Sequence, residues 1–321
     1  MIAVLTSHDY QRHLPLEKLT AAFDKCVFMD TGDPDLSVSI TSDSFILRNG
    51  SACIDLLQDH CFYYPESFSL HSLRALGEGL PDEQKAIALD SWLAVWEAVE
   101  AVSLQTPSRW LNAPCFARPA DNKALLSFYD TASHGFSTLK SMTSNDRDRV
   151  LRASAGNGFA VKAVSRKEYL GSDALLATQY FAHSELLEFA GDIATCPLLY
   201  QPFVVSPRQL RIYVIGNAVL PFEIVSDHSR LKPDVRVAND LDYAIDHAVL
   251  PATIIDGIRE FVRQDLQLSY VALDFLVEDD KPILIDINPN GVWNWMPANL
   301  TNEIDTAFIS MLRDHFVGGV D

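Results

Sequence analysis

Two carboxylates and one amide stand in the segment YVALDFLVEDDKPILIDINPNGVWNWMP, residues 270–297, which has the pattern of a β-hairpin. Short apolar runs flank a polar turn, as in two antiparallel strands. A turn centred on Asp280 places Asp274 opposite Asp286, with Asn288 two residues further along the same face. Because opposed like charges are destabilising unless they are neutralised, this arrangement favours a hard cation such as Mg²⁺. The alternative is a pair of strand carboxylates that reach solvent at a sheet edge.

Basic side chains interrupt two other apolar strands, at Lys162 in FAVKAVS and at Arg211 in QLRIYVIG. A charged group in a buried strand needs an anionic partner, and phosphate oxygens suit both side chains. The alternatives are a lysine that reaches solvent from an edge strand and an arginine in a structural ion pair. Between them, Gln201 lies in LLYQPFVV. This segment is able to read an adenine edge through its amides, although most such segments are core strands.

The elements that must hold these side chains mix strands with helices. The first hundred or so residues predict a small α/β unit, with a strand at Ile2–Thr6 and a long helix at Asp82–Val102. The proline-rich segment 106–122 is the predicted linker. Beyond it we expect a helix over Lys123–His134, an amphipathic helix over Ile254–Gln267 and several strands without a strict βαβ repeat. This mixture predicts the α/β (α+β) fold class.

Composition excludes several functional classes. With 321 residues, 48% of them hydrophobic, the chain can supply the core of two or three domains. No apolar run approaches the roughly 18 residues of a membrane span, and no secretion signal is visible, so we expect a cytoplasmic protein without membrane contact. The five scattered cysteines lack CxxC spacing and indicate free thiols rather than structural zinc. The net charge of −18 disfavours nucleic acid as a partner.

The order of the chemical groups from Lys162 to Asn288 resembles that of the ATP-grasp ligases. The resemblance is closest to the microviridin-type peptide macrocyclases, also called graspetide synthetases, and more distant to the ribosomal-protein glutamate ligases. Three segments carry it: WLNAPCFARPADNKALLSFYDTASHGFSTLKSMTSND, QPFVVSPRQLRIYVIGNAV and the hairpin segment described above. The final NPNGVWNW is typical of the macrocyclase branch. Residues 108–321 resemble the family well, and the first hundred only in outline.

The resemblance implies an ATP-grasp fold with three parts. These are an N-terminal pre-ATP-grasp α/β domain over residues 1–112, a central ATP-grasp subdomain over 113–198, and a C-terminal subdomain with the metal site over 199–321. A closed site would protect a reactive intermediate from water, and Ser154–Gly158 together with Ser165–Ser172 is the candidate lid.

Carried over position by position, the resemblance implies a nucleotide site. Lys123 and Lys162 would contact the phosphates of ATP. Gln201, Phe203 and Val204 would line the adenine pocket. ATP is therefore the expected nucleotide.

The resemblance also implies the metal and acceptor sites. Asp274, Asp286 and Asn288 would hold Mg²⁺. Arg211 would stabilise the γ-phosphate and an acyl phosphate, and Arg236 would lie near the acceptor carboxylate. By itself, an arginine in a polar loop such as Arg236 is usually a solvated charge.

Several positions qualify the resemblance. The family usually has glutamate where this chain has Asp286, and the shorter side chain alters the expected metal geometry. The aromatic-arginine-arginine stretch typical of peptide macrocyclases is replaced by FYYPESF around Tyr64, which leaves the peptide substrate open. Asn290, Trp293 and Trp295 are candidates for the substrate side of the site. A tryptophan pair at a spacing of two is also typical of packing on a strand face.

The implied activity is ATP-dependent, ADP-forming ligation of an activated carboxylate to an amine or a hydroxyl. The leading hypothesis is a macrocyclase of natural-product biosynthesis that forms side-chain ester or amide crosslinks in a ribosomally made precursor peptide. The second is a ligase of the same fold that joins small molecules, such as amino acids, through a small carboxylate substrate. The third is a nucleotide-binding module without ligase activity. Homodimers are common among such enzymes, and the sequence leaves the oligomeric state open.

Overall fold

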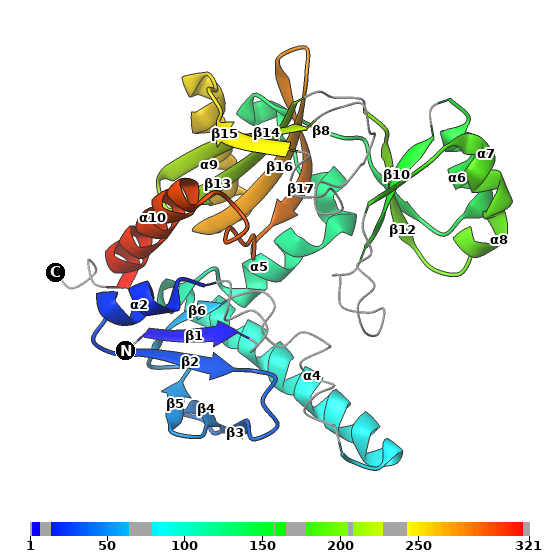
Figure 1. Cartoon of the computed structure of the whole chain (residues 1–321). Coiled ribbons are helices and arrows are strands. Elements are labelled where there is room, and N and C mark those ends of the chain that lie inside the picture. Colours follow the sequence, from blue (N-terminus) through cyan, green and yellow to red (C-terminus); the bar gives the residue numbers. More distant parts are fainter. Residues whose placement is uncertain are drawn as a thin grey trace.

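The computed structural model describes residues 2–6, 14–63, 79–156, 158–164, 178–204, 208–226 and 243–316 (Figure 1). The strands within these ranges form four sheets. None of the helices in the same ranges is both long enough and apolar enough to cross a membrane.

The N-terminal part combines a parallel sheet with a small antiparallel one. The parallel sheet has the order β2-β1-β6-β7, and the antiparallel sheet has the order β3-β4-β5. Their strands are β1 (Ile2–Thr6), β2 (Cys26–Asp30), β3 (Ser37–Ile40), β4 (Phe45–Asn49), β5 (Ala52–Asp55), β6 (His60–Tyr63) and β7 (Trp110–Leu111). The helices are α2 (Leu16–Ala22), α4 (Asp82–Gln105) and α5 (Pro114–Asp121), with a 3₁₀ turn η1 (Pro107–Arg109). The predicted α/β alternation is confirmed, and α4 runs slightly past its predicted end.

A further four-stranded sheet stands at the side of the molecule in Figure 1, and we call it the smaller sheet to distinguish it from the six-stranded sheet described next. Its order is β11-β10-β12-β9, and its neighbouring strands are antiparallel. The elements here are β9 (Met142–Ser144), α6 (Arg147–Ser154), β10 (Phe159–Ala163), β11 (Gln179–Phe181), α7 (His183–Glu188), α8 (Ala190–Ile193) and β12 (Leu198–Pro202). Val150, Phe159, Leu186 and Tyr200 belong to a hydrophobic cluster of this part alone.

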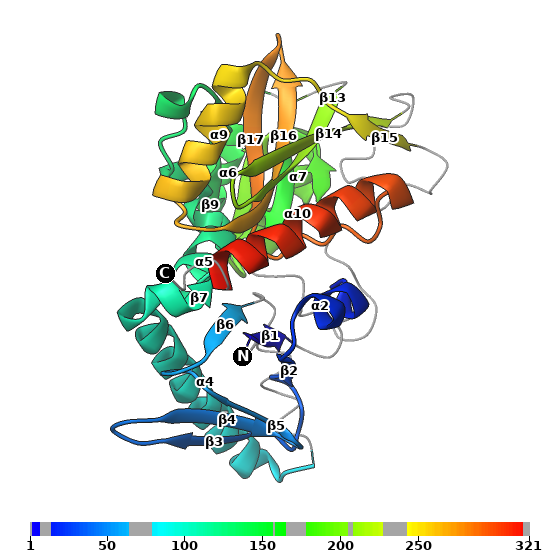
Figure 2. The same ribbon diagram turned by 90° about the vertical axis from the view of Figure 1, so that its left-hand side faces the viewer.

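The third region is a six-stranded sheet of order β15-β14-β13-β16-β17-β8. Its strands are β8 (Ser137–Thr138), β13 (Arg208–Ile215), β14 (Ala218–Ser226), β15 (Tyr243–His247), β16 (Tyr270–Glu278) and β17 (Lys281–Asn288). Helix α9 (Ala252–Gln264) and helix α10 (Ala298–Phe316) flank it (Figure 2). Ile212 of β13 clusters with Phe261 of α9, whereas its neighbour Tyr213 clusters with Phe308 of α10. Because successive strand residues point to opposite faces, the two helices cover opposite faces of the sheet.

The N-terminal part packs directly on this six-stranded sheet. A single hydrophobic cluster contains Trp96 of α4 together with Leu273 of β16. The buried side chain of Asn112 donates to the carbonyl oxygen of Tyr270 at 2.6 Å and accepts from the backbone N–H groups of Ser269 and Tyr270. The predicted linker therefore makes a tight contact with the first strand of the hairpin through its middle.

One predicted helix is wrong. Residues 123–134 form two short 3₁₀ helices, η2 (Lys123–Phe128) and η3 (Ala132–His134). Tyr129 between them has an extended backbone, with φ −76° and ψ 126°, and its ring packs edge-on against Phe261 at 5.6 Å. The Asn122 side chain accepts from the N–H of Ala124 and starts η2. Tyr129 therefore packs against α9 with an extended backbone, and this interrupts the predicted continuous helix.

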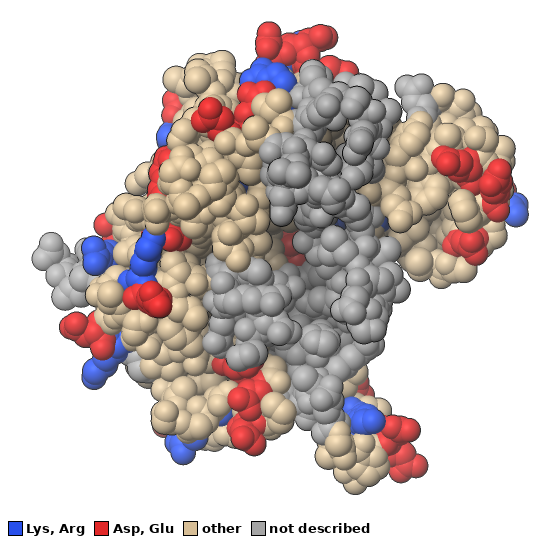
Figure 3. Space-filling view, viewed as in Figure 1, with Lys and Arg blue, Asp and Glu red and all other residues tan. Residues whose placement is uncertain are grey.

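Charged side chains form scattered groups on the visible described surface (Figure 3). Acidic residues gather at the top of that view, where the β16–β17 hairpin ends. The acidic residues of this turn are Glu278, Asp279 and Asp280, all of which are exposed.

Candidate active site

The β16–β17 hairpin holds the two predicted metal-type carboxylates. Asp274 faces Asp286 across the two strands, as predicted. The turn itself differs from the prediction, because Asp279 and Asp280 both have positive φ, 48° and 60°, and form a two-residue turn that pairs Glu278 with Lys281. Asp tolerates this left-handed backbone better than most residues do. The register near the turn is therefore one residue away from the register predicted for a turn centred on Asp280.

An irregularity within the hairpin restores the predicted pairing. The register shifts between Asp274 and Phe275, so that Phe275 pairs with Leu284 and leaves Ile285 as the extra residue of a β-bulge. Because of this extra residue, Leu284 and Ile287 share the hydrophobic cluster on the α9 side although they are three positions apart. Asp286 consequently faces the opposite side of the sheet, beside Asp274.

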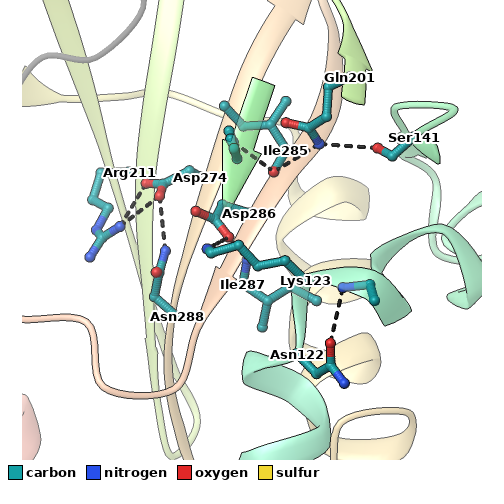
Figure 4. Close-up of polar contacts among 12 residues, drawn as sticks. Asn122, Lys123, Ser141, Gln201, Arg211, Asp274, Ile285, Asp286, Ile287 and Asn288 are labelled. Carbon is teal, nitrogen blue, oxygen red and sulfur yellow. Dashed lines mark hydrogen bonds and ion pairs between the residues drawn. The ribbon is translucent and has the colours of Figure 1, made fainter. Parts of the chain in front are cut away.

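The bulged residue also connects the hairpin to the smaller sheet. The carbonyl oxygen of Ile285 accepts from Lys162 Nζ of β10 at 3.4 Å and from Gln201 Nε2 of β12 at 3.3 Å. Gln201 also donates to the hydroxyl oxygen of Ser141 at 3.1 Å (Figure 4). The bulge therefore brings residues of two separate sheets to one place.

A row of charged side chains crosses the six-stranded sheet at this level. Arg211 of β13 is the register partner of Asp274, which in turn pairs with Asp286. Arg211 Nη1 donates to both carboxylate oxygens of Asp274, at 2.7 and 2.8 Å. Asn288 Nδ2 donates to Asp274 Oδ2 at 3.0 Å (Figure 4). The strand register thus aligns a guanidinium, two carboxylates and an amide on one face.

Lys123 contacts this row of side chains from outside the sheet. It begins η2, and its Nζ donates to Asp286 Oδ1. Burial alone would raise the pKa of the Asp286 carboxyl, but Lys123 and then Lys162 outweigh this effect and lower its pKa from 3.8 to about 2. The Asp286 carboxyl is therefore ionised, and each of the two facing carboxylates has a basic partner, Arg211 for Asp274 and Lys123 for Asp286.

Replacing Lys123 by Met is expected to make the stability less sensitive to acid. The pKa of Asp286 is lowered in the folded state, so its ionised form stabilises the fold by about 2 kcal/mol above pH 4, and this stabilisation is lost as the pH falls toward about 2. Without Lys123, burial raises that pKa again. Urea unfolding should therefore give a larger loss of unfolding free energy at pH 6 than at pH 3, by about 1 kcal/mol.

The exposed Lys140 provides the matched control for this experiment. Lys140→Met should change the unfolding free energy little and equally at both pH values. An equal loss for Lys123→Met at pH 6 and pH 3 would show that Lys123 does not hold the Asp286 carboxyl in its ionised form.

Arg211 has a largely buried side chain that packs against an aromatic ring. The side chain is 11% exposed, and its Cζ lies 5.3 Å from the centre of the Tyr213 ring. Burial would lower its pKa, but Asp274 outweighs this effect and raises it, so the guanidinium stays charged. Among the described residues, none supplies a hydrogen-bond partner for the buried Nε atom. An unused, buried donor of a permanently charged group is suited to an anionic ligand such as phosphate.

Gly291 lies close to this guanidinium. A Cβ atom at this position would lie 2.2 Å from Ala272 Cβ and 2.8 Å from Arg211 Nη2. The glycine in the NPNG sequence is thus required by the close approach of the backbone to Ala272 and to the guanidinium.

The substitution Gly291→Ala is expected to destabilise the protein by about 1–3 kcal/mol, because the added methyl group overpacks this region. Thermal unfolding measures this change. Gly191→Ala is the control, since no described atom outside its own helix and chain neighbours lies within 4 Å of where its Cβ would be. A Gly291→Ala protein as stable as the control would show that the turn relaxes away from Arg211 without strain.

The remaining predicted residues lie in different surroundings. Gln201 is buried, and its amide nitrogen is used by Ser141 and Ile285. Phe203 packs against Tyr180, with ring centres 4.3 Å apart, and Val204 is partly buried next to it. The adenine pocket that these residues were predicted to line stays a prediction.

Some predicted features lie outside the described residues. These are Arg236, the FYYPESF region from Tyr64 onward, residue 157 and the candidate lid segment Ser165–Ser172.

The two candidate tryptophans differ in burial. Trp293 is 1% exposed and belongs to the core beside α10, as the packing alternative predicts. Trp295 is 37% exposed, and its Nε1 donates to the carbonyl oxygen of Val292 at 2.9 Å. Asn290 is partly buried. Only Trp295 and Asn290 therefore keep side chains accessible to a substrate.

Sequence reasoning missed several contacts of this site. They involve Ser141, Tyr213, the Ile285 carbonyl and Gly291. Tyr213 had a usable signal, because it lies two residues after Arg211 and so on the same strand face. The contact of Ser141 with Gln201 joins residues 60 positions apart, and no local pattern indicates it.

The residues present fit a magnesium ion better than a structural zinc ion. Within the described ranges, no three His, Cys, Asp or Glu side chains are grouped so that they could hold a metal. The set of Asp274, Asp286 and the amide oxygen of Asn288 supplies oxygen atoms only. Mg²⁺ binds proteins through one or two carboxylates and completes its shell with water and substrate phosphates. This donor set has that composition.

Comparison with known proteins identifies the fold. No protein-family model and no curated protein matches the chain. Among solved structures, the macrocyclase MdnC from Microcystis aeruginosa, bound with the precursor peptide MdnA, is 19% identical with a TM-score of 0.75, over 98% of this chain and 99% of that one. A RiPP-associated ATP-grasp ligase from Chryseobacterium gregarium, in complex with ADP and a leader and core peptide, is also 19% identical with a TM-score of 0.75, over 98% and 96% of the two chains.

A third similar structure is D-alanyl-alanine synthetase A from Vibrio cholerae. It is 12% identical with a TM-score of 0.60, over 99% of this chain and 97% of that one. The three similarities extend over almost the whole of each chain. They show that this chain has the ATP-grasp fold, and they confirm the predicted fold class.

Proposed function

From the ATP-grasp fold, we propose that this chain is an ATP-dependent, ADP-forming ligase that activates a carboxylate. One observation carries the proposal: Arg211, Asp274 and Asp286 form a row across the sheet, at the point where Lys162 and Lys123 approach. Both signs of charge that phosphoryl transfer requires, cationic groups for phosphate oxygens and carboxylates for a metal, are thus concentrated at one junction.

We assign the nucleotide phosphates to Lys123, Lys162 and Arg211. Asp274, Asp286 and Asn288 would hold Mg²⁺, which would neutralise charge on the phosphate oxygens. Gln201, Phe203 and Val204 remain our assignment for the adenine side, and Arg236 for the acceptor carboxylate.

The proposed reaction has two steps. A carboxylate oxygen of the substrate attacks the γ-phosphorus of ATP, the bond to the β-phosphate oxygen breaks, and ADP and an acyl phosphate result. An amine or hydroxyl then attacks the acyl carbon, loses its proton and expels inorganic phosphate. Arg211 stabilises the negative charge that develops on the transferred phosphoryl group, and the protein itself forms no covalent bond.

The substrate that we propose is a ribosomally made precursor peptide, in which the enzyme forms side-chain ester or amide crosslinks. Support comes from the similarity to MdnC and to the RiPP-associated ligase, both of which were solved with peptides. A second candidate is the joining of small molecules such as amino acids. It is supported by the similarity to D-alanyl-alanine synthetase A and by the FYYPESF sequence at Tyr64.

We also propose the boundaries of three structural units along the chain. Residues 1–112 form the domain that precedes the ATP-grasp unit, residues 113–198 form the central subdomain, and residues 199–321 form the C-terminal subdomain with the metal site. The separate hydrophobic cluster of the smaller sheet, which ends at Tyr200, supports the boundary near residue 198.

The test is intact-mass spectrometry combined with measurement of ADP release, with the enzyme, ATP and Mg²⁺ in each reaction. Precursor-like peptides containing Thr, Lys, Asp and Glu should lose one water per crosslink. A condensed product from free amino acids, with every peptide mass unchanged, would favour the small-molecule ligase. Hydroxylamine added to either reaction should trap the acyl phosphate as a hydroxamate. Absence of ADP and hydroxamate with all these substrates would count against the ligase proposal.

A further inference from the structure

Three residues form the floor beneath the Arg211 guanidinium: Tyr213, Ala272 and Gly291. The Tyr213 ring lies below the guanidinium, and Gly291 approaches its Nη2 atom and the Ala272 methyl group. Two tyrosine hydroxyls hold the backbone of this turn. Tyr213 Oη donates to the carbonyl oxygen of Val292 at 2.8 Å, and Tyr270 Oη donates to that of Gly291. The position of the guanidinium therefore depends on the turn that follows β17.

Trp293 anchors this turn from the other side. Its ring packs against Tyr213 and Tyr270, with ring centres 6.4 and 5.7 Å away, so it touches both tyrosines that hold the turn. It also packs against Phe308 of α10 at 5.3 Å. Packing alone would suit any large aromatic residue at this position. The indole has one feature that phenylalanine lacks, because its Nε1 donates to Asp305 Oδ1 at 2.7 Å.

Asp305 is a buried carboxylate on α10, 5% exposed. One oxygen accepts from Trp293, and the other accepts from Lys18 Nζ of α2 at 2.6 Å. Lys18 also donates to Asn302 Oδ1 at 2.8 Å. A buried carboxylate is destabilising unless it is paired and hydrogen-bonded, and here both oxygens are satisfied. The resulting chain of contacts runs from the N-terminal part through α10 to the turn beside Arg211.

We propose that Trp293 and Asp305 are positioning residues for Arg211, and that Lys18 of the N-terminal part completes their support. The inference rests on the proposed function, in which Arg211 binds the γ-phosphate. A hydrogen bond between the indole and a carboxylate fixes the rotation of the ring, which packing alone leaves less defined. The fixed ring holds Tyr213 and the Gly291 turn, and these hold the guanidinium in the plane that a phosphate requires.

The test measures two dissociation constants by calorimetry in the presence of Mg²⁺, for Trp293→Phe and for the wild type. One ligand is a non-hydrolysable β,γ-imido analogue of ATP, and the other is ADP. Only the ATP analogue has the γ-phosphate that Arg211 is proposed to bind. Trp293→Phe should weaken binding of the ATP analogue about tenfold, which is the loss expected when one hydrogen bond between the Arg211 guanidinium and the charged γ-phosphate is lost. Binding of ADP should change less than twofold. Asp305→Asn keeps the side-chain shape but loses the ion pair with Lys18. It should also lower the ratio of the affinity for the ATP analogue to the affinity for ADP.

The control is Trp96→Phe, the same substitution at a core position of α4 that is 2% exposed. It should lower the melting temperature without changing the ratio of the two affinities. In an Arg211→Lys background, Trp293→Phe should have no further effect on the ratio, because its effect acts through the guanidinium.

The outcomes distinguish failure of the positioning role of Trp293 and Asp305 from failure of the proposed role of Arg211. If Arg211→Lys lowers the ratio but Trp293→Phe and Asp305→Asn change only the melting temperature, the positioning role is overturned and the proposed function stands. If Arg211→Lys itself leaves the ratio unchanged, Arg211 does not bind the γ-phosphate. In that case the proposed role of Arg211 and the inference built on it both fail.

Discussion

Turnover should fall by about three orders of magnitude when Asp274 is replaced by Asn. The asparagine is nearly the same shape but neutral, so one of the two carboxylates of the proposed Mg²⁺ site is lost. The change also leaves Arg211 without the carboxylate that its Nη1 contacts at 2.7 and 2.8 Å. Product formation and ADP release measure the loss of activity. Stabilisation of the protein by Mg²⁺ together with ADP should disappear as well.

Asp279→Asn is the matched control for this variant. Asp279 lies in the same hairpin and is exposed, and its positive φ of 48° is one that asparagine also adopts readily. This control should retain wild-type turnover and wild-type stabilisation by Mg²⁺ and ADP. Turnover retained in Asp274→Asn would overturn the assignment of this carboxylate to the metal.

The substitution Arg211→Lys should lower kcat by about two to three orders of magnitude, although the positive charge is kept. Lysine lacks the planar fork that binds phosphate oxygens in pairs, and its ammonium group cannot fill the space between Tyr213 and Gly291. Because a guanidinium contact to the γ-phosphate matters most in the transition state, kcat should change more than KM for ATP. Steady-state kinetics with a saturating acceptor substrate separates the two parameters.

Arg208 offers a control in the same strand. It binds Glu223 through two nitrogen atoms, at 2.9 and 3.1 Å, and this ion pair is partly exposed. Arg208→Lys should therefore reduce stability slightly and leave kcat within about twofold, since exposed ion pairs contribute little. Equal losses of kcat in the two variants would mean that Arg211 acts through the general stability of β13 rather than at the reacting phosphate.

The β-bulge at Ile285 explains how this site joins two sheets. In a regular strand, successive carbonyl groups point alternately toward one edge of the strand and toward the other. The extra residue instead presents a carbonyl oxygen to Lys162 and Gln201, which lie on different strands of the smaller sheet. This contact places Lys162 near Asp286, and the lysine helps to lower the pKa of that carboxyl.

Local sequence patterns determined the part of the site that lies within single strands. The alternation of side chains placed Asp286 and Asn288 on the same face of one strand and Arg211 on another apolar strand, and the 3.6-residue period predicted the amphipathic helix that α9 forms. These predictions succeeded because side-chain direction in a strand or helix follows from backbone geometry alone. The sequence likewise pointed to the ATP-grasp fold through the order of its charged residues.

Only the tertiary structure decided how distant groups meet. Lys123 reaches Asp286 because its segment bends into two 3₁₀ helices around Tyr129, where a helix was predicted. The register near the turn depends on the positive φ of Asp279 and Asp280, and the bulge at Ile285 compensates for it. Such features arise from packing between segments far apart in the chain, whereas periodicity reports only which face a residue occupies. For this reason the sequence alone could place each charge on an element, but not assign its partner.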